Sequence, residues 1–250
     1  GEDLTKVSGQ RLREIRGNQI AFIFQEPMSS LNPVLTIGTQ VAEPIWLHHK
    51  KSWSEAFEQA GELLQRVAIP DAVKRLEDYP HQFSGGMRQR VMIAMALACQ
   101  PKLIIADEPT TALDVTVQAQ ILSLLKNLTK EANSSLILIT HDLGVVARYA
   151  DKVAVMYGGR VVETAYATEL YKNPQHPYTE GLMASIPKLD GDPGSRLYTI
   201  EGQPPDLSNL PSGCSFNPRC PHAQEKCTAN KPKLAEVAPN HLRACFGYER

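Results

Sequence analysis

Apolar residues follow two patterns along the first two thirds of the chain. Short runs at residues 19–24, 102–106 and 135–140 are rich in β-branched residues or leucine, and their apolar residues stand at successive positions. Such runs are typical of parallel strands covered on both faces. Between the last two runs, residues 117–132 carry apolar side chains at helical spacing: Ile121, Leu122, Leu124, Leu125 and Leu128. Strand, helix, strand predicts a βαβ crossover and therefore an α/β fold.

A helical block is predicted between the first two strands, at about residues 36–100. Its best-marked helix keeps helical spacing at Trp53, Ala56, Phe57, Ala60, Leu63, Leu64 and Val67. Ser52 and Glu55 form a capping box, the sequence signature of a helix N-terminus. We expect this block to be an inserted helical subdomain.

The pattern changes towards the C-terminus. Residues 152–157 and 160–164 flank Gly158 and Gly159, which predicts a β-hairpin. Beyond about Asn173, prolines interrupt the periodicity at 174, 177, 187, 193, 204, 205, 211, 218 and 221. We therefore predict a main domain at residues 1–172, and a Pro-rich linker with a small C-terminal extension at residues 173–250.

Composition narrows the possible partners. The 250 residues are 42% hydrophobic, enough for one large core or a core with a small appendage. A formal net charge of −1 gives no electrostatic reason to expect nucleic acid as the main partner. The longest apolar runs, at 91–99 and 136–140, fall short of the roughly 20 residues that cross a bilayer, and we expect no signal peptide. We expect a cytoplasmic chain.

Two adjacent carboxylates, Asp107 and Glu108, follow the second predicted strand. They would emerge at the carboxyl end of a parallel sheet, where ligands of such folds bind. Asp107 could hold Mg²⁺ through water, and Glu108 could polarise the water that attacks a γ-phosphate. Taken alone, the pair is equally compatible with two solvated acids at a strand end.

Two further segments could contact phosphate. Ser84, Gly85 and Gly86 precede an apolar helical run, so free backbone N–H groups and the helix dipole could receive an anion. An isolated Ser-Gly-Gly is more often only a helix cap in a tight turn. His141 follows the third strand and could donate to the γ-phosphate, although a lone histidine there is more often a surface residue.

These segments occur together and in fixed order within residues 84–142. FSGGMRQR resembles the signature motif of the ATP-binding subunits of ABC transporters, LIIADEPT the Walker B segment, LDVT the D-loop, and FIFQEP the Q-loop with Gln25. His141 matches the switch histidine. The resemblance covers essentially the whole chain. Within that family, the segments IFQEPMSSLNPVLTIGTQVAEP, NPQHPYTEGLMASIP and EGQPPDLSNLPSGCSFNPRCP resemble importers of peptides and of related solutes such as nickel.

The resemblance implies roles for single residues. Two subunits of this family dimerise head to tail, so one subunit offers its signature helix to the ATP of the other. Gln25 would sense the γ-phosphate and the Mg²⁺, whereas by itself it reads only as a polar loop residue. Contacts to a partner's ATP are implied for Ser84, Gly85, Gly86, Gln89 and Asp114.

One expected motif is missing. A P-loop needs glycine followed by lysine and then Ser or Thr, and none of the sixteen glycines is followed by lysine. The sequence also opens at Gly1 without a methionine, so we expect that its natural beginning is absent. The site containing Asp107 and Glu108 would then be incomplete, sheet surface would be exposed, and the chain would not hydrolyse ATP alone. The intact parent subunit should do so.

The implied assembly contains a second ATPase subunit, preferably a paralogue, and two transmembrane permease subunits. An extracytoplasmic solute-binding protein completes it, and the chain would lie peripherally on the cytoplasmic face of the plasma membrane. Two other functions stay open. One is a soluble ABC ATPase of DNA repair or translation, and the other is a non-catalytic partner that completes another subunit's ATP site.

Four of the five cysteines lie in the tail: Cys214, Cys220, Cys227 and Cys245. Cys99 ends an apolar helix and reads as a core residue. A cytoplasmic location argues against disulfides and leaves a metal site or free thiols. The spacings differ from the paired CxxC of zinc ribbons. Some members of the resembled importer family carry a four-iron four-sulfur cluster on such a tail, so the resemblance favours that cluster over zinc, in a structural or sensing role.

Overall fold

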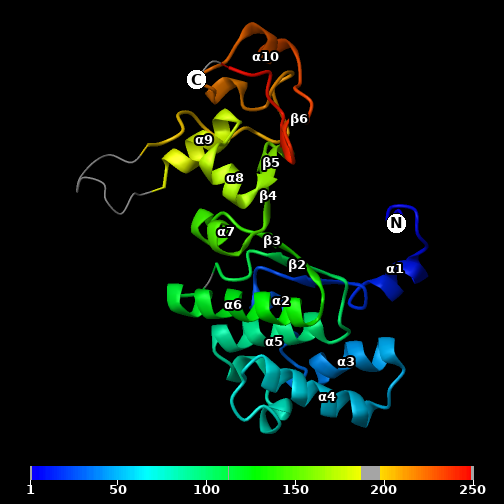
Figure 1. Ribbon diagram of the computed structural model, residues 1–250. Coiled ribbons are helices and arrows are strands. Elements are labelled where there is room, and N and C mark those ends of the chain that lie inside the picture. Colours follow the sequence, from blue (N-terminus) through cyan, green and yellow to red (C-terminus); the bar gives the residue numbers. More distant parts are fainter. Residues whose placement is uncertain (1, 112, 187–197, 249–250) are drawn as a thin grey trace. The chain divides into compact units, whose positions relative to one another are not determined.

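The computed structural model of the chain describes residues 2–111, 113–186 and 198–248, in two compact units, Gly1–His141 and Asp142–Arg250 (Figure 1). The first unit contains a parallel sheet and the second an antiparallel sheet. The domain boundary predicted at residues 172 and 173 falls inside the second unit, between α8 (Ala167–Lys172) and α9 (Pro177–Ala184), and stays a prediction.

The parallel sheet has the order β1 (Ile20–Ile23), β2 (Leu103–Asp107), β3 (Ser135–Ile139). All three strands run the same way, with Ile23 opposite Ala106 and Asp107 opposite Ile139. Helix α6 (Val115–Glu131) connects β2 to β3. The predicted crossover and the α/β class are therefore confirmed.

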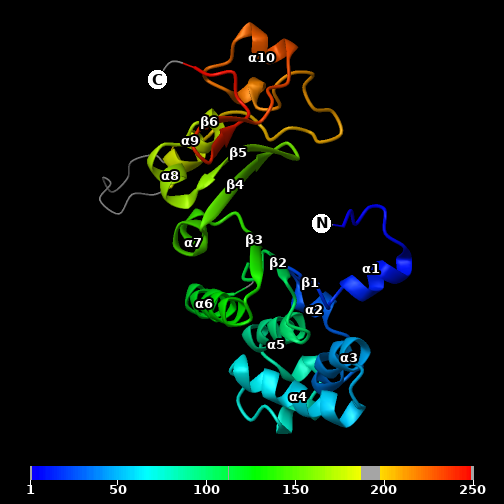
Figure 2. The same ribbon diagram turned by 45° about the vertical axis from the view of Figure 1, so that its right-hand side comes forward.

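Helices α5 (Gly85–Leu97) and α6 lie on the same side of this sheet, as both ribbon views show (Figure 2). Helix α5 contributes Val91, Ile93 and Ala94, which are completely buried, to the core. Helix α6 begins two residues before its predicted start because the Asp114 side chain accepts a hydrogen bond from the Val117 N–H and caps it.

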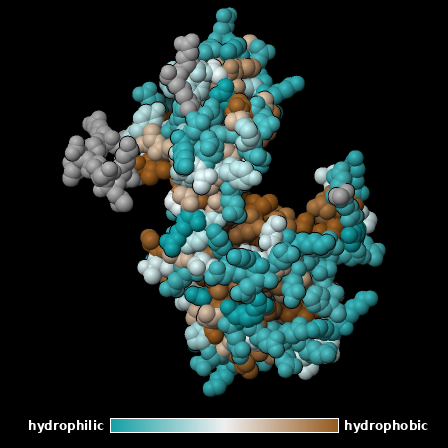
Figure 3. Space-filling model, in the orientation of Figure 1, coloured by the Kyte–Doolittle hydropathy of each residue, from teal (hydrophilic) through white to brown (hydrophobic). Residues whose placement is uncertain are grey.

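The other side of the sheet is open to solvent. Phe22, Phe24, Ile137 and Ile139 are 41–55% exposed, and Figure 3 shows hydrophobic side chains at the surface over this part of the molecule. The prediction that the strands are covered on both faces is wrong for β3, where exposed and partly buried residues alternate. The reason is that α5 and α6 shield only the side chains that point towards them.

The helical block has two long helices before α5: α3 (Ile37–His49) and α4 (Trp53–Arg66). The predicted capping box is present, since the Ser52 hydroxyl accepts from the Glu55 N–H and Glu55 accepts from the Ser52 N–H at 2.8 Å. Short 3₁₀ turns at Lys74–Glu77 and Pro80–Gln82 lead into α5. The remaining helices of this unit are α1 (Gly9–Ile15) and α2 (Pro27–Ser30).

The second unit begins with α7 (Leu143–Tyr149) and contains a sheet of order β4 (Lys152–Tyr157), β5 (Arg160–Tyr166), β7 (His241–Arg243), β6 (Ala235–Ala238). The predicted hairpin is confirmed: β4 and β5 are antiparallel, and Gly158 and Gly159 adopt φ of 55° and 73°. Positive φ at both positions is what a two-residue hairpin turn requires.

The tail contributes structure that its prolines concealed. Strands β6 and β7 add to the hairpin, and Leu242 pairs with Thr164 of β5. Helix α9 begins at Pro177, which fits because the first helical turn needs no N–H donor there. A 3₁₀ turn at Asn217–Arg219 and the helix α10 (Glu225–Ala229) complete the extension.

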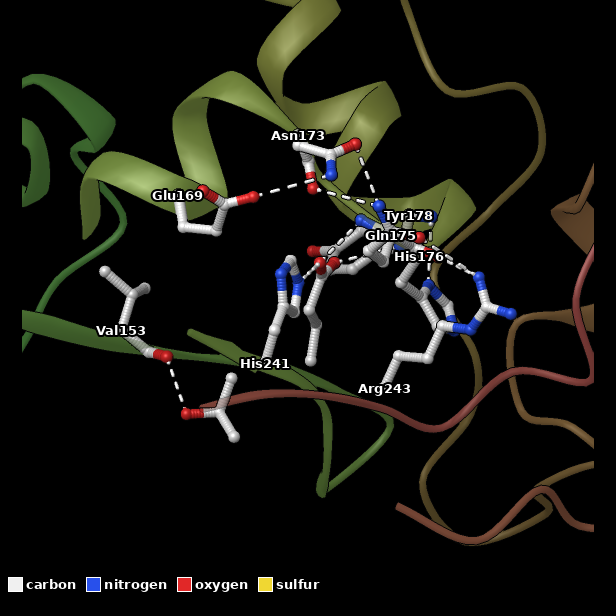
Figure 4. Close-up of polar contacts among 10 residues, drawn as sticks. Val153, Glu169, Asn173, Gln175, His176, Tyr178, His241 and Arg243 are labelled. Atoms are coloured by element: carbon white, nitrogen blue, oxygen red, sulfur yellow. Dashed lines mark hydrogen bonds and ion pairs between the residues drawn. The ribbon is translucent and has the colours of Figure 1, made fainter. Parts of the chain in front are cut away.

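One buried carboxylate joins three segments of this unit (Figure 4). The side chain of Glu163 on β5 has no exposed surface. Its Oε1 lies 2.6 Å from Nε2 of His241 on β7, and accepts from the Gln175 N–H at 2.5 Å. Its Oε2 accepts from the His176 N–H at 3.0 Å. The carboxylate therefore ties β7 and the start of α9 to β5.

His176 supports this junction as a neutral side chain. Burial lowers the pKa of His176 to about 4. The neutral ring can accept, and its Nδ1 does accept from the Tyr178 N–H at 3.1 Å, which caps α9. The N–H groups at and just before the start of α9 have no partner within the helix. Glu163 and His176 therefore accept hydrogen bonds from those of Gln175, His176 and Tyr178.

Replacing Glu163 by Gln should destabilise the second unit by about 3 kcal/mol, because an amide NH₂ would face N–H donors in a buried site. Urea unfolding measures the change, and hydrogen exchange at Gln175 and His176 should localise it. Glu236→Gln is the matched control on exposed β6, since the amide oxygen can still accept from Asn240. Equal stability of both variants would contradict the role of Glu163.

Candidate ATP site and cysteine cavity

Three polar side chains meet at the carboxyl ends of the parallel strands. Gln25 follows β1, Glu108 follows β2 and His141 follows β3. The Gln25 amide donates to Oε2 of Glu108 at 2.9 Å. Nδ1 of His141 lies 2.9 Å from Oε1 of the same carboxylate. The sheet thus brings the three predicted catalytic residues into direct contact.

The position of Glu108 is determined by its backbone as well as by these contacts. Its φ of 43° is left-handed, a region in which a non-glycine residue is strained. Its N–H donates to the Ile139 carbonyl at 2.9 Å, and the Thr111 hydroxyl donates to Oε2 at 2.9 Å. Sequence reasoning missed Thr111, although its position three residues after Glu108 was a usable signal.

Hydrogen bonds make Glu108 more acidic. The contact with His141, and then that with Thr111, lowers the pKa of the Glu108 carboxyl below its ordinary value of 4.5. The group is therefore ionised at neutral pH. The Glu108 side chain is 24% exposed and that of His141 is 71% exposed. An ionised carboxylate that solvent can reach is able to accept a hydrogen bond from a water molecule.

Asp107 occupies the last position of β2 and is partly exposed beside this cluster. Within residues 2–111, 113–186 and 198–248, no group of three or more His, Cys, Asp or Glu side chains is arranged to hold a metal ion. Mg²⁺ commonly binds one or two carboxylates together with substrate phosphates. The assignment of Asp107 and Gln25 to Mg²⁺ therefore stays a prediction.

A second group of predicted residues surrounds the starts of α5 and α6. Ser84 caps α5, accepting from the Met87 N–H, as Asp114 caps α6. The two helix starts pack closely, because a Cβ added at Gly86 would lie 3.0 Å from Val117. The signature segment and the D-loop are therefore neighbours. The missing Cβ at Gly86 allows this close packing.

Gln89 is separated from this surface by burial. Its side chain is 1% exposed, and its amide nitrogen has no hydrogen-bond partner among the described residues. Gln89 thus lies on the buried face of α5, which packs against the core. Ser84 and Asp114, in contrast, are exposed. Its assignment as an ATP contact stays a prediction.

The four tail cysteines line one small cavity of about 20 Å³, with aromatic residues beside them. The Cys214 N–H donates to the Cys227 carbonyl at 2.8 Å, which holds two of the cysteines close together. Burial raises the pKa of Cys214, and raises that of Cys220 to about 11. These two thiols are therefore protonated at neutral pH unless a metal displaces the protons.

Comparisons with known proteins agree with the motifs. The ABC transporter family matches residues 1–111, and the C-terminal region of oligopeptide/dipeptide transporters matches residues 162–227. The oligopeptide transport ATP-binding protein OppD of Salmonella typhimurium is 54% identical over 98% of this chain and 73% of its own length. The corresponding AppD of Bacillus subtilis is 54% identical over 99% and 75%. This chain belongs to the ATP-binding subunits of oligopeptide ABC transporters.

Solved structures show the same fold. An ATP-binding cassette solved as a dimer in a post-hydrolysis state, with ADP and Pi, is 32% identical, with a TM-score of 0.57 over 65% of this chain and 68% of its own. The cbiO1 protein of Clostridium perfringens, part of a cbiONQ transporter complex, is 30% identical, with a TM-score of 0.56 over 66% and 62%. The predicted family, the ATPase activity class and the ABC-type core are confirmed.

The family regions contain most of the predicted residues. Gln25, the signature segment and Glu108 lie within residues 1–111, and three of the four tail cysteines lie within residues 162–227. His141 and Cys245 lie outside both matched regions. In the described part of the chain, none of the helices is long and apolar enough to cross a membrane.

Replacing His141 by Ala should raise the pKa of Glu108 towards 4.5, because the largest interaction that lowers it is removed. A depressed carboxyl pKa stabilises the fold above the unfolded value and ceases to do so as pH falls through the folded value. The variant should therefore be less stable than the parent above the ordinary carboxyl pKa, and the difference should vanish as pH falls through the folded pKa of Glu108. NMR titration of the Glu108 carboxyl measures the shift. Thr111→Val is the control for the second, smaller contact, and an unchanged pKa in His141→Ala would contradict the assignment.

Proposed function

We propose that this chain is an ATP-binding subunit of an importer that takes up peptides. The observation that carries the proposal is the ionised Glu108, held by Gln25, Thr111 and His141 at the ends of the parallel strands. Peptides are preferred over nickel as the solute because the similar curated proteins are named as peptide transporters.

The geometry supports a division of roles in hydrolysis. Glu108 would accept a proton or hydrogen bond from the attacking water, and its fixed orientation removes the need to reorganise. His141, largely exposed, can turn a ring N–H towards the γ-phosphate. Gln25 contacts Glu108 directly and so can report the state of the site to the segment that follows it. Mg²⁺ bound near Asp107 would neutralise phosphate charge.

The chain offers its second group of residues to a different nucleotide. Ser84, Gly85 and Gly86 begin α5, where N–H groups and the positive end of the helix dipole favour phosphate. Asp114 stands beside them at the start of α6. We propose that this surface completes the ATP site of a second ATPase subunit, a paralogue in preference to a copy of this chain.

These 250 residues contain no glycine followed by lysine and so no P-loop. The carboxylates Asp107 and Glu108 would face a bound triphosphate with little compensating positive charge. We therefore propose that these residues do not hydrolyse ATP without a P-loop. In the full transporter, two permease subunits and an external solute-binding protein would complete the assembly. The chain would lie on the cytoplasmic face of the membrane.

We also propose a four-iron four-sulfur cluster on the tail, with zinc as the alternative. All four cysteines line one cavity and four thiolates can complete the cluster's protein ligation, but in the described residues they are not arranged to hold a metal ion. The cavity of about 20 Å³ must open for a group of that size. A bound cluster would stabilise a tail too short to build a large core of its own.

Mixing this chain with a relative that contains a P-loop tests the shared site. ATP turnover should appear only on mixing and should survive Glu108→Gln in this chain, since the hydrolysing carboxylate belongs to the partner. Ser84→Asp should abolish it, because Asp still caps α5 but repels phosphate, whereas Ser84→Asn should cap without that repulsion. Turnover by the chain alone that disappears in Glu108→Gln would contradict the proposal.

Single Cys→Ser changes at positions 214, 220, 227 and 245 test the cluster. Each should reduce bound iron and sulfide after anaerobic reconstitution and make the tail more sensitive to limited proteolysis, without affecting the first unit. Cys99→Ala, in the first unit, is the control. If zinc binds stoichiometrically and iron does not, the alternative metal is correct. Unchanged proteolysis in all four variants would exclude a structural role.

A further inference from the structure

The turn between α3 and α4 exposes large apolar side chains. Trp46 is 48% exposed, Leu47 is 62% exposed and Trp53 is 42% exposed. The rings of Trp46 and Trp53 lie edge to face with centroids 6.0 Å apart, so one indole from each helix meets at the same place. Residues 46–53 are called the aromatic corner below. Figure 1 shows the two helices side by side, joined by this short turn.

The aromatic corner is also basic. Its eight residues, WLHHKKSW, contain two histidines and two lysines and no acid. Lys50 ends α3 in a left-handed conformation with φ of 53° and is exposed. The nearest acid in sequence, Glu55, accepts hydrogen bonds from Ser52. Those bonds are the main cause of its lowered pKa, and Lys51 is the weakest cause.

A polar hollow adjoins the corner. It has a volume of about 200 Å³, and its lining includes the cationic or titratable side chains of His49, Lys51 and Arg66. Glu62 is the acid in its lining, and Arg66 is also paired with Glu131 at 3.2 Å. The hollow has room for a phosphate-sized group beside the exposed indoles.

We propose that the aromatic corner binds an anionic phospholipid surface. Tryptophan is favoured at the membrane interface, where its apolar ring and its N–H are both accommodated, and juxtamembrane lysines are attracted to anionic headgroups. The centres of protein interfaces are instead depleted in lysine, so two lysines between two exposed tryptophans favour a lipid partner over a protein one. The proposal concerns membrane affinity and does not depend on ATP hydrolysis.

The two tryptophans of the corner are the chain's only tryptophans, so tryptophan fluorescence, excited selectively over the eight tyrosines, reports on this site alone. Adding vesicles of phosphatidylcholine with phosphatidylserine should shift the emission to shorter wavelength and carry the chain into the vesicle pellet. Phosphatidylcholine alone should do neither, and high salt should reverse both effects because it screens the charges. Inorganic phosphate should leave the emission unchanged.

Charge variants test the lysines. Lys50→Gln with Lys51→Gln should weaken binding to the anionic vesicles at least about tenfold. Lys126→Gln with Lys130→Gln removes the same charge from α6 and should bind like the parent. If both double variants lost the same amount of vesicle binding, the attraction would depend only on net charge. That result would overturn the assignment of lipid binding to the aromatic corner.

Apolar variants test insertion. Leu47→Ser should weaken binding and reduce the spectral shift, whereas Val73→Ser, at a residue 61% exposed, should not. Both changes are at exposed side chains, so neither should unfold the helices, and circular dichroism verifies this. An absent blue shift with anionic vesicles would overturn the proposal. A blue shift that appears only with vesicles containing reconstituted permease would also overturn the proposal, and would indicate a protein partner.

Discussion

The parallel register of β1, β2 and β3 is the constraint on which the candidate ATP site depends. Gln25, Glu108 and His141 are far apart along the chain and share no local structure. Because the three strands run in the same direction, their carboxyl ends meet at one edge, and the residues that follow them come within hydrogen-bond distance. The left-handed backbone of Glu108 then directs its carboxylate between the amide and the imidazole. Strain of this kind persists only where surrounding contacts over-determine the conformation.

The starts of helices α5 and α6 form the second candidate surface, and local helix capping positions its residues. Ser84 and Asp114 each accept a hydrogen bond from their own helix, so both helices begin at a defined residue. The absence of a Cβ at Gly86 lets these starts pack together. Glu108, with Gln25 and His141, would act on the attacking water molecule. The surface at the starts of α5 and α6 instead offers backbone N–H groups to a phosphate. In the proposed function these two groups of residues serve two different ATP sites, and one similar ATP-binding cassette was solved as a dimer.

The second unit is organised by polar burial as well as by hydrophobic packing. Glu163 has no exposed surface, yet its carboxylate receives hydrogen bonds from two backbone amides and contacts His241. A buried polar group without a hydrogen-bond partner lowers the free energy of unfolding, so each of these contacts stabilises the unit. The carboxylate therefore specifies how the tail's β7 pairs with β5. Cys245 lies two residues beyond β7, so the same pairing determines where the cysteine cavity forms.

Local signals in the sequence sufficed for the βαβ unit, the capping box at Ser52 and Glu55, and the glycine turn at 158 and 159, since neighbouring residues decide these features. The motifs also identified the family and named Gln25, Glu108 and His141. Tertiary structure decided the rest. The exposure of Ile137 and Ile139 depends on which helices cover the sheet, and no local pattern in the sequence indicates the burial of Gln89. Glu163 meets His241 across 78 residues, a pairing that only the antiparallel addition of β7 creates.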